Sequence, residues 1–337
     1  MDVLSDVLRV VRLTSAVFYT ARFSSPWSIE SPPPDQLARS LRLRAESIAL
    51  FHVLVEGQCW ISMEGHAPLR MEARDVIIFP HGDPHVMSGQ IGARPRAISA
   101  LLPSQPSEEI PQLDYGGGGE ATRFVCGFLH CDQRFNPLIG ALPTMLCVCG
   151  RDGAGQGEPS EVETAKRPGP VLIEAEGWLA NTLRHTIEEA EGMRPGSSAM
   201  LARLTELLYV EVLRRYMRQL PSGHTSWLAG VNDPEVGRAL RLLHARPERQ
   251  WTVEDLAREV GVSRSGLAQR FTELVGEAPM RYLTGWRIQL AKHLILQAGL
   301  PIAEVADRVG YESEAAFNRA FRRHVGAPPV AWRKKSS

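Results

Sequence analysis

The stretch GVSRSGLAQRFTELVGEAP, residues 261–279, is followed by GYESEAAFNRAFRRHVGAPP, residues 310–329, which is a loose second copy of it. Gly261 recurs as Gly310 and Phe271 recurs as Phe321, so the second copy is one residue longer after its glycine. The apolar pattern that precedes each glycine is repeated as well. A segment that occurs twice in this way is expected to fold into two copies of one supersecondary unit.

Each copy has the pattern of a helix-turn-helix. Apolar residues recur at i, i+3, i+4 and i+7 on both sides of the glycine, which predicts two amphipathic helices. The glycine falls just past the first helix, where the turn requires a positive φ, and Ser263 is the expected N-cap of the next helix. Phe271 and Phe321 are expected to anchor the second helix to the core, so that its opposite face is free to enter a DNA major groove.

The two units are joined by RYLTGWRIQLAKHLILQAG, residues 281–299, which is itself helical in pattern. Through TVEDLAREVGVSRSGLAQRF (252–271) and PIAEVADRVGYESEAAFNRAFRRHVGAPPVAWR (301–333), the C-terminal part resembles the DNA-binding domain of the AraC/XylS transcription regulators. The resemblance implies that the second helix of each unit enters a major groove. It also implies that the connecting helix holds the two about one turn of DNA apart, roughly 34 Å.

The resemblance places the candidate DNA contacts on the second helix of each unit. Gln269 and Arg319 fall where the family has base-contacting side chains, and glutamine with adenine and arginine with guanine are favoured bidentate pairs. Arg322 and Arg323 are expected to contact phosphate, which positions a protein without specifying sequence. The alternative is that these are solvated residues of a helix surface. The full candidate set is Arg264, Ser265, Gln269, Arg270, Glu314, Asn318, Arg319, Arg322 and Arg323.

The composition indicates a protein without a membrane span. The chain has 337 residues, 44% of them hydrophobic, which favours two domains with real cores. Its 38 basic side chains balance 38 acidic ones, although basic residues outnumber acidic ones from Arg258 onward. No stretch approaches the roughly 20 apolar residues of a membrane helix, and five cysteines do not make a disulfide framework. We therefore expect a cytoplasmic protein.

Between about residues 37 and 150 the pattern changes to short runs of strand-forming residues separated by turns. SIALFHVLVEG (47–57), QCWISMEG (58–65) and ARDVIIFPHGDPHVM (73–87) are examples. Many short strands at this spacing predict a β-barrel or sandwich. Residues 151–169 are polar and glycine-rich, which indicates a loop or linker.

The turn PHGDPH, residues 80–85, is similar to the second cupin motif, a glycine followed after five residues by Pro-x-Gly-x-x-His. Arg74 replaces the first glycine of that motif, whereas the proline, the second glycine and the histidine match. His52 stands where the first cupin motif has a histidine, but Leu54 occupies the place of the second one. Because a divalent metal enzyme needs three or four converging ligands, no cofactor is expected and metal binding stays open.

A cupin-like barrel ahead of tandem helix-turn-helix units is the layout of many AraC-type regulators, which implies that the barrel binds a small-molecule effector of unknown identity. The candidate effector-binding residues are His52, His81 and His85. The alternative for these histidines is a hydrogen-bonding role in a turn. The cysteines at positions 126, 131, 147 and 149 leave a redox or zinc sensor open, although alternate residues of a strand also pack as core thiols.

The expected fold has two domains: an N-terminal all-β cupin-like barrel followed by helices, and a C-terminal all-α domain with two helix-turn-helix units joined by a long helix. The expected bounds are 1–155 for the effector-sensing domain, 156–230 for the linker and dimerisation helices, and 231–337 for the DNA-binding domain. One helical stripe suits either packing on the barrel or a homodimer interface. It consists of Leu201, Leu204, Leu207, Leu208, Val212 and Tyr216.

The predicted function is sequence-specific binding of double-stranded DNA by an effector-controlled transcription regulator that is not an enzyme. RNA polymerase is a further candidate partner, and the sequence leaves activation or repression open. The alternative is a cupin-type metal-dependent enzyme, or a metal or redox sensor, with an appended helical domain.

Overall fold

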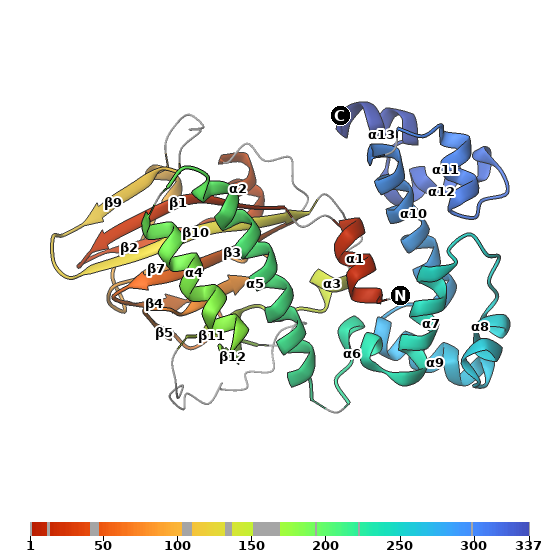
Figure 1. The fold of residues 1–337 in the computed structure, drawn as a ribbon, viewed down its shortest axis with the longest axis horizontal. Coiled ribbons are helices and arrows are strands. Elements are labelled where there is room, and N and C mark those ends of the chain that lie inside the picture. Colours follow the sequence, from red (N-terminus) through yellow and green to blue (C-terminus); the bar gives the residue numbers. More distant parts are fainter. Residues whose placement is uncertain are drawn as a thin grey trace. The chain divides into compact units, whose positions relative to one another are not determined.

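Contacts divide the chain into two units, which Figure 1 shows as ribbons. The computed structural model describes residues 2–11, 14–40, 47–102, 110–131, 137–150, 169–192, 194–221, 223–297 and 299–336. We call the first unit the β unit, which consists of Leu13–Asp132 and Leu142–Gln219. The second, the helical unit, consists of Met1–Arg12, Gln133–Ala141 and Leu220–Ser337. No helix among the described residues is both long and apolar enough to cross a membrane.

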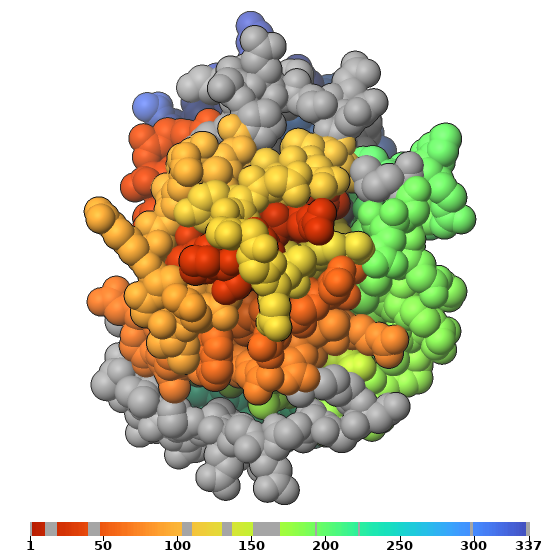
Figure 2. All heavy atoms as spheres, turned by 90° about the vertical axis from the view of Figure 1, so that its left-hand side faces the viewer, coloured from red at the N-terminus to blue at the C-terminus, as the bar shows by residue number. Residues whose placement is uncertain are grey.

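The β unit contains two sheets, as the short strand-forming runs predicted. The larger sheet has the order β12 (Val171–Glu174), β11 (Leu146–Cys149), β6 (Val76–Phe79), β3 (Ser47–Glu56), β10 (Ala121–Cys131), β1 (Thr14–Ser24), β9 (Gln112–Gly116). The smaller sheet has the order β5 (Leu69–Glu72), β4 (Gln58–Ser62), β7 (His85–Ser88), β2 (Ser28–Ser31), β8 (Arg96–Ala97). Because partners in a sheet are distant in sequence, segments coloured red, orange and yellow interleave on the face shown in Figure 2.

An apolar core is shared by buried side chains of the two sheets. Phe23 and Phe124 come from the larger sheet and pack on Trp27, with ring centroids 5.0 and 5.6 Å from the indole. Ile29, Ile61, Met71 and Met87 of the smaller sheet belong to the same buried cluster. The β unit also contains the short helix α2 (Pro34–Ser40) and a 3-10 turn, Ile98–Ala100.

Two positions of the cupin-like motif show how its backbone depends on residue type. Gly82 has a φ of +65°, and a Cβ there would lie 2.6 Å from the carbonyl oxygen of Ile48, so only glycine fits. Arg74, which replaces the first glycine of the motif, has a φ of 78° and is the one non-glycine residue with positive φ among those described. This left-handed conformation costs a side-chain-bearing residue about 1–2 kcal/mol. The backbone therefore keeps the shape of the motif although the glycine is gone.

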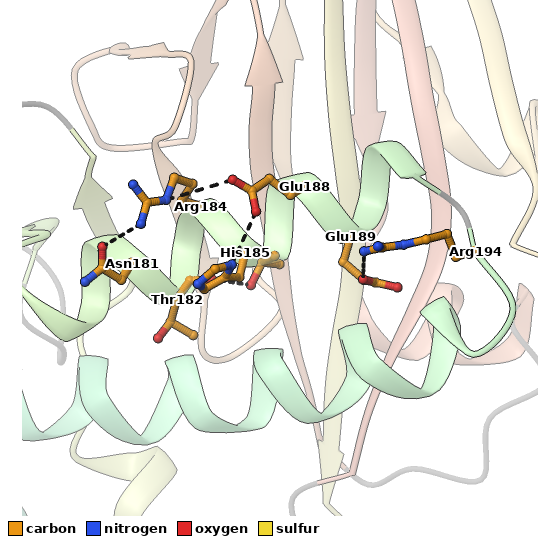
Figure 3. Close-up of polar contacts among 8 residues, drawn as sticks. Asn181, Thr182, Arg184, His185, Glu188, Glu189 and Arg194 are labelled. Carbon is orange, nitrogen blue, oxygen red and sulfur yellow. Dashed lines mark hydrogen bonds and ion pairs between the residues drawn. The ribbon is translucent and has the colours of Figure 1, made fainter.

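Two helices, α4 (Trp178–Gly192) and α5 (Ser197–Gln219), form a hairpin that belongs to the β unit. Glu189 holds the hairpin together at its tip, because its carboxylate accepts hydrogen bonds from Arg194 (2.7 Å) and Ser197 (2.5 Å). Figure 3 shows Glu189 with Arg194, and on the outer turns of α4 the ion pairs of Glu188 with Arg184 and His185. Helix α5 packs on β1 and β12.

The apolar stripe of α5 is divided between the core and the surface. Leu201, Leu208, Val212 and Tyr216 are buried within the β unit, so this part of the stripe is intramolecular core. Leu207 and Met200, by contrast, are 51% and 52% exposed. These two residues lie two helical turns apart on one face of α5, which leaves a short apolar strip uncovered in the chain.

The helical unit is built from the repeated helices. Its elements after residue 220 are α6 (Trp227–Asn232), α7 (Pro234–Ala245), α8 (Val253–Val260), α9 (Arg264–Val275), α10 (Pro279–Gln297), α11 (Ile302–Arg308), α12 (Glu314–Val325) and α13 (Pro329–Ser336). The predicted C-terminal all-α domain with two helix-turn-helix units and a long connecting helix is thus confirmed.

Two short helices from earlier in the chain also belong to the helical unit, namely α1 (Val3–Val11) and α3 (Pro137–Gly140). This differs from the expected division, which assigned residues 1–155 to one sensing domain. The physical reason is that α1 buries Val3, Leu4 and Val7 against α7 and α10. Asp6, on the same face of α1, is 4% exposed and places Oδ2 3.8 Å from Nδ1 of the buried His244.

The first prediction concerns the start of the C-terminal domain. Helix α6 contacts α7 and α9, its Trp227 is 3% exposed and Leu228 is fully buried, and Nε1 of Trp227 donates a hydrogen bond to the Tyr282 hydroxyl (3.1 Å). We expect a fragment of residues 232–337 to be less stable than one of 220–337 by about 3–5 kcal/mol, because loss of α6 uncovers the apolar side of α9.

Thermal and urea denaturation of the two fragments measure this difference. A fragment of residues 226–337, which keeps α6 and its Ser226 N-cap, is the control and should match the longer fragment. Equal stability of the fragments that start at 226 and 232 would contradict the assignment of α6 to the core.

Candidate functional site

The two helix-turn-helix units share a positive-φ glycine in the turn and a serine cap on the second helix, and the glycines and Ser263 were predicted from the sequence. Gly261 and Gly310 have φ values of 92° and 80°, which a residue with a Cβ rarely adopts. Ser263 accepts a hydrogen bond from the amide of Gly266 (3.1 Å), and Ser313 accepts one from the amide of Ala316 (3.2 Å). Each serine therefore satisfies one free amide at the start of the second helix of its unit.

Each second helix is anchored by buried aromatic side chains, Phe271 on α9 and both Phe317 and Phe321 on α12. Phe271 and Phe321 are fully buried, and both helices end at a glycine with left-handed φ, Gly276 and Gly326. One face of each helix is thereby fixed against its unit. The opposite face points to solvent over its whole length, which is the arrangement by which a helix enters the major groove.

The candidate DNA contacts lie on these free faces. Eight of them are exposed, namely Arg264, Ser265, Gln269, Arg270, Glu314, Arg319, Arg322 and Arg323, and Asn318 is half-buried. Among the described residues, the guanidinium groups of Arg319 and Arg322 form no hydrogen bond or ion pair. Nε2 of Gln269 donates a hydrogen bond to Glu273 on the same helix (2.8 Å), and both side chains are exposed, so a base edge can replace this bond.

Two candidates of the first unit are paired with carboxylates. Arg264 lies 3.4 Å from Glu254 of α8, and both side chains are well exposed, so this pair is easily opened. Arg270 has a closer partner: its Nε and Nη2 lie 2.9 and 2.5 Å from Oδ2 of Asp233. The side chain of Asp233 is only 7% exposed. Arg270 is therefore directed toward the N-terminus of α7.

The connecting helix α10 sets the spacing of the two units. Its 19 residues span roughly 28 Å at 1.5 Å per residue. It packs on α9 at one end and on α11, α12 and α13 at the other. A rod of this length suits two helices that enter successive major grooves on one face of the duplex.

A second candidate site is a row of polar side chains inside the β unit. Tyr19 on β1 pairs with Cys126 on β10, and Cys126 pairs with His52 on β3, so the three residues are neighbours across one sheet. Nδ1 of His52 lies 3.0 Å from Sγ of Cys126. Nε2 of His52 lies 3.0 Å from Nε2 of His85, which belongs to β7 of the other sheet. The row thus crosses the core from one sheet to the other.

The hydrogen-bond partners of His52 and His85 determine which ring nitrogens carry a proton. Nδ1 of His85 faces the carbonyl oxygen of Asp83 at 2.9 Å and must donate to it, which leaves Nε2 of a neutral His85 as an acceptor. Nε2 of His52 must then donate to His85, so Nδ1 of His52 accepts from the thiol of Cys126. The hydroxyl of Tyr19 donates to the sulfur of Cys126.

Burial keeps all members of the row neutral. His52 and His85 are each 2% exposed, and His85 stacks on Phe79 with a centroid distance of 3.7 Å. Burial lowers the pKa of His85 to about 4, against the opposing effect of the Asp83 carbonyl. Burial lowers the pKa of His52 well below its usual value, and the nearby His85 adds a smaller lowering. Burial raises the pKa of the Cys126 thiol to about 12, although the Tyr19 hydroxyl opposes this shift.

The row does not have the ligand set of a metal centre. His52 and His85 converge through Nε2, but His81 instead lies with Nε2 3.1 Å from the carbonyl oxygen of Leu142. Among the residues that the structure describes, no group of three or more histidine, cysteine or acidic side chains is placed to hold a metal ion. Cys147 and Cys149 are buried in the sheet, and the side chain of Cys131 lies outside the described residues.

Two members of these sites were missed in the sequence. Tyr19 joins the row only because β1 pairs with β10. The residues around Tyr19 in the sequence do not indicate that pairing. Asp233 could have been recognised, because an aspartate directly before a proline and a helical pattern is the signature of an N-cap with proline at the first helical position.

Comparison with known proteins gives matches over both units. A family model described as cupin matches residues 2–165 and 168–218, and one described as helix-turn-helix domain matches residues 256–335. An AraC-like transcription regulator of Streptomyces lividans is 31% identical over 99% of this chain and 98% of its own. The HTH-type transcriptional regulator AlkR of Acinetobacter baylyi is 25% identical over the full length of both chains. A crystal structure of the AdpA DNA-binding domain with a target DNA is 34% identical over 31% of this chain and 92% of that chain, with a TM-score of 0.29.

The second prediction concerns the histidine pair and pH. The unfolded chain takes up protons on both histidines near pH 6.5, whereas His85 in the folded chain does so only near pH 4. Unfolding between these values therefore takes up protons, and the free energy of unfolding falls as the pH falls from about 6.5 to 4. The loss is at most about 1.4 kcal/mol per pH unit and per histidine.

Urea denaturation at pH 7 and pH 5 measures this loss in the wild type and in the double variant His52→Gln/His85→Gln. The double variant should lose less stability between the two pH values, because it cannot take up these protons. His66→Gln, between β4 and β5, is the control and should keep the wild-type pH dependence. Parallel pH profiles for the wild type and the double variant would contradict burial of a neutral pair.

Proposed function

The chain belongs to the AraC family of helix-turn-helix transcription regulators with an N-terminal cupin domain, and we propose that α9 and α12 enter two successive major grooves of its target DNA. Gln269 of α9 and Arg319 of α12 contact base edges in this proposal, whereas Arg322 and Arg323 contact phosphates. Arg264, Ser265, Glu314 and Asn318 line the same two helix faces.

The observation that carries this proposal is the free face of each second helix. Phe271 and Phe321 fix the other face, α10 spaces the two helices, and Arg319 stands exposed without a partner among the described residues. A guanidinium group without a carboxylate partner can form a bidentate pair with guanine at no cost in broken ion pairs. Relatives of this chain over its full length are named transcription regulators, which supports the same function.

Control by an effector in the β unit forms the second part of the proposal. His52 and His85 have no ring nitrogen left over, and His81 uses Nε2 in a bond to Leu142, so an effector that engages these histidines must replace one of their bonds. Replacing a bond in the row alters the contact between the two sheets, since His52 and His85 belong to different sheets. Such a ligand acts on transcription only through its different affinities for two states of the protein.

The proposed assembly is a homodimer that binds double-stranded DNA, with RNA polymerase as a further partner. The strip of Met200 and Leu207 supports the dimer, because contact with a second copy would bury both of these half-exposed apolar side chains. A metal-dependent cupin enzyme is the weaker candidate, since the described residues supply only two converging histidine nitrogens.

The third prediction tests the proposed DNA contacts. Arg319→Ala should weaken binding to the selected target by about 1–3 kcal/mol and relax the preference at one base pair. Arg323→Ala should weaken binding to all sequences alike and lower the salt dependence by about one counterion. Titration of both variants with a duplex selected from a random library, and with unrelated DNA, measures the difference. Equal losses on the two duplexes for Arg319→Ala would remove its base-contacting role.

The fourth prediction tests the dimer. Leu207→Glu should convert a dimer to a monomer at micromolar concentration, because a carboxylate in the centre of an apolar interface is desolvated without a partner. Sedimentation equilibrium measures the mass of the variant, and circular dichroism checks its fold. Ser198→Glu, exposed on the opposite side of α5, is the matched control and should leave the mass unchanged. A dimeric Leu207→Glu protein would exclude this strip as the interface.

A further inference from the structure

Arg270 differs from the other arginines on the DNA-facing helices, because a nearly buried carboxylate holds it. Its Nε and Nη2 lie 2.9 and 2.5 Å from Oδ2 of Asp233, and Nε lies 3.7 Å from Glu235. Half of the arginine side chain is still exposed, whereas Asp233 is 7% exposed. The guanidinium group is thus placed between two carboxylates at the N-terminus of α7.

Asp233 uses its two oxygens for two different helices. Oδ1 accepts hydrogen bonds from the amides of Glu235 (3.0 Å) and Val236 (2.9 Å), which makes Asp233 the N-cap of α7. Oδ2 accepts from Arg270 of α9. The bonds from Arg270 and Val236 lower the pKa of Asp233 despite its burial. One side chain therefore joins the start of the scaffold helix α7 to the second helix of the first unit.

The second copy of the unit gives independent information about this position. Phe271 corresponds to Phe321, so Arg270 corresponds to Ala320 and Gln269 corresponds to Arg319. Ala320 is 8% exposed and belongs to the core of its unit, whereas Arg319 is exposed. The position of Arg270 thus borders the buried face of the helix, and the preceding position borders the free face.

We propose that Arg270 is a positioning residue and not a DNA contact: with Asp233 it fixes the orientation of α9 on α7, and so it sets how Gln269 meets the bases. This proposal rests on the function proposed above. A phosphate at Arg270 would also approach Asp233 and Glu235, and the repulsion from these carboxylates would cancel the attraction by the arginine. In the second unit the packed Ala320 stands at this position, so no ion pair is needed there.

The test is a double-mutant cycle of Asp233→Asn and Arg270→Gln in the full-length protein. Asparagine is as good an N-cap as aspartate, so the first change removes the charge and keeps the cap. The probe is a duplex selected from a random library by the wild-type protein. The half-site of α9 is the half in which Gln269→Ala changes base preference, and the half-site of α12 is defined in the same way by Arg319→Ala.

We expect each single variant to lose about three- to tenfold in discrimination at the α9 half-site, and the double variant to lose no more than either single one. Discrimination at the α12 half-site and the salt dependence of binding should stay at wild-type values. Arg323→Ala supplies the contrasting profile of a phosphate contact. Arg308→Gln breaks a comparable ion pair with Glu304 on α11 (2.7 Å) and should change neither half-site.

Other results would overturn the proposal. If Arg270 contacts phosphate, Arg270→Gln weakens selected and unrelated DNA alike with a smaller salt dependence, while Asp233→Asn frees the arginine and tightens binding. Additive losses in the double variant, unchanged discrimination, or equal losses at both half-sites would also exclude a positioning role; the last result would indicate general destabilisation. Failure of the wild-type protein to select any sequence would instead refute the function proposed above.

Discussion

The burial of phenylalanine side chains beneath α9 and α12 is the constraint on which the helical unit depends. Phe271 and Phe321 fix the rotation of α9 and α12 about their axes. Both rings are fully buried in a close-packed core, so a rotation of either helix would take its ring out of the cavity that it fills. Once the rotation is fixed, the positions two residues before each ring face solvent by helix geometry. The free face for DNA is thus a consequence of the buried face.

The same constraint explains why the two copies differ where they do. The phenylalanine, the turn glycine and the capping serine are shared, since each is required by the backbone or the core. The residue that precedes each phenylalanine borders the core and is an alanine in one copy and an ion-paired arginine in the other. We infer that packing of Ala320 holds the helix in the second copy, where the ion pair of Arg270 with Asp233 holds it in the first.

In the β unit, strand register has the role that helix rotation has in the other unit. The pairing of β1, β10 and β3 places Tyr19, Cys126 and His52 in one row, and His85 meets this row from the opposite sheet. The row is satisfied with every member neutral, so burial costs no unpaired charge. The barrel motif has thus kept its shape, including a left-handed Arg74 where the motif has glycine, while its histidines bond to each other.

The sequence by itself determined the two helix-turn-helix units, their turn glycines, their N-cap and their buried phenylalanines, because these features depend on residues close together in the chain. It also determined the β-rich N-terminal half and the place of His52 and His85 in a cupin-like motif. Only the tertiary structure decided that Tyr19 and Cys126 complete the row, that α1 belongs to the helical unit, and that Arg270 pairs with Asp233. These contacts join residues that are distant in sequence, and no local pattern records which distant partner a side chain meets when the core closes.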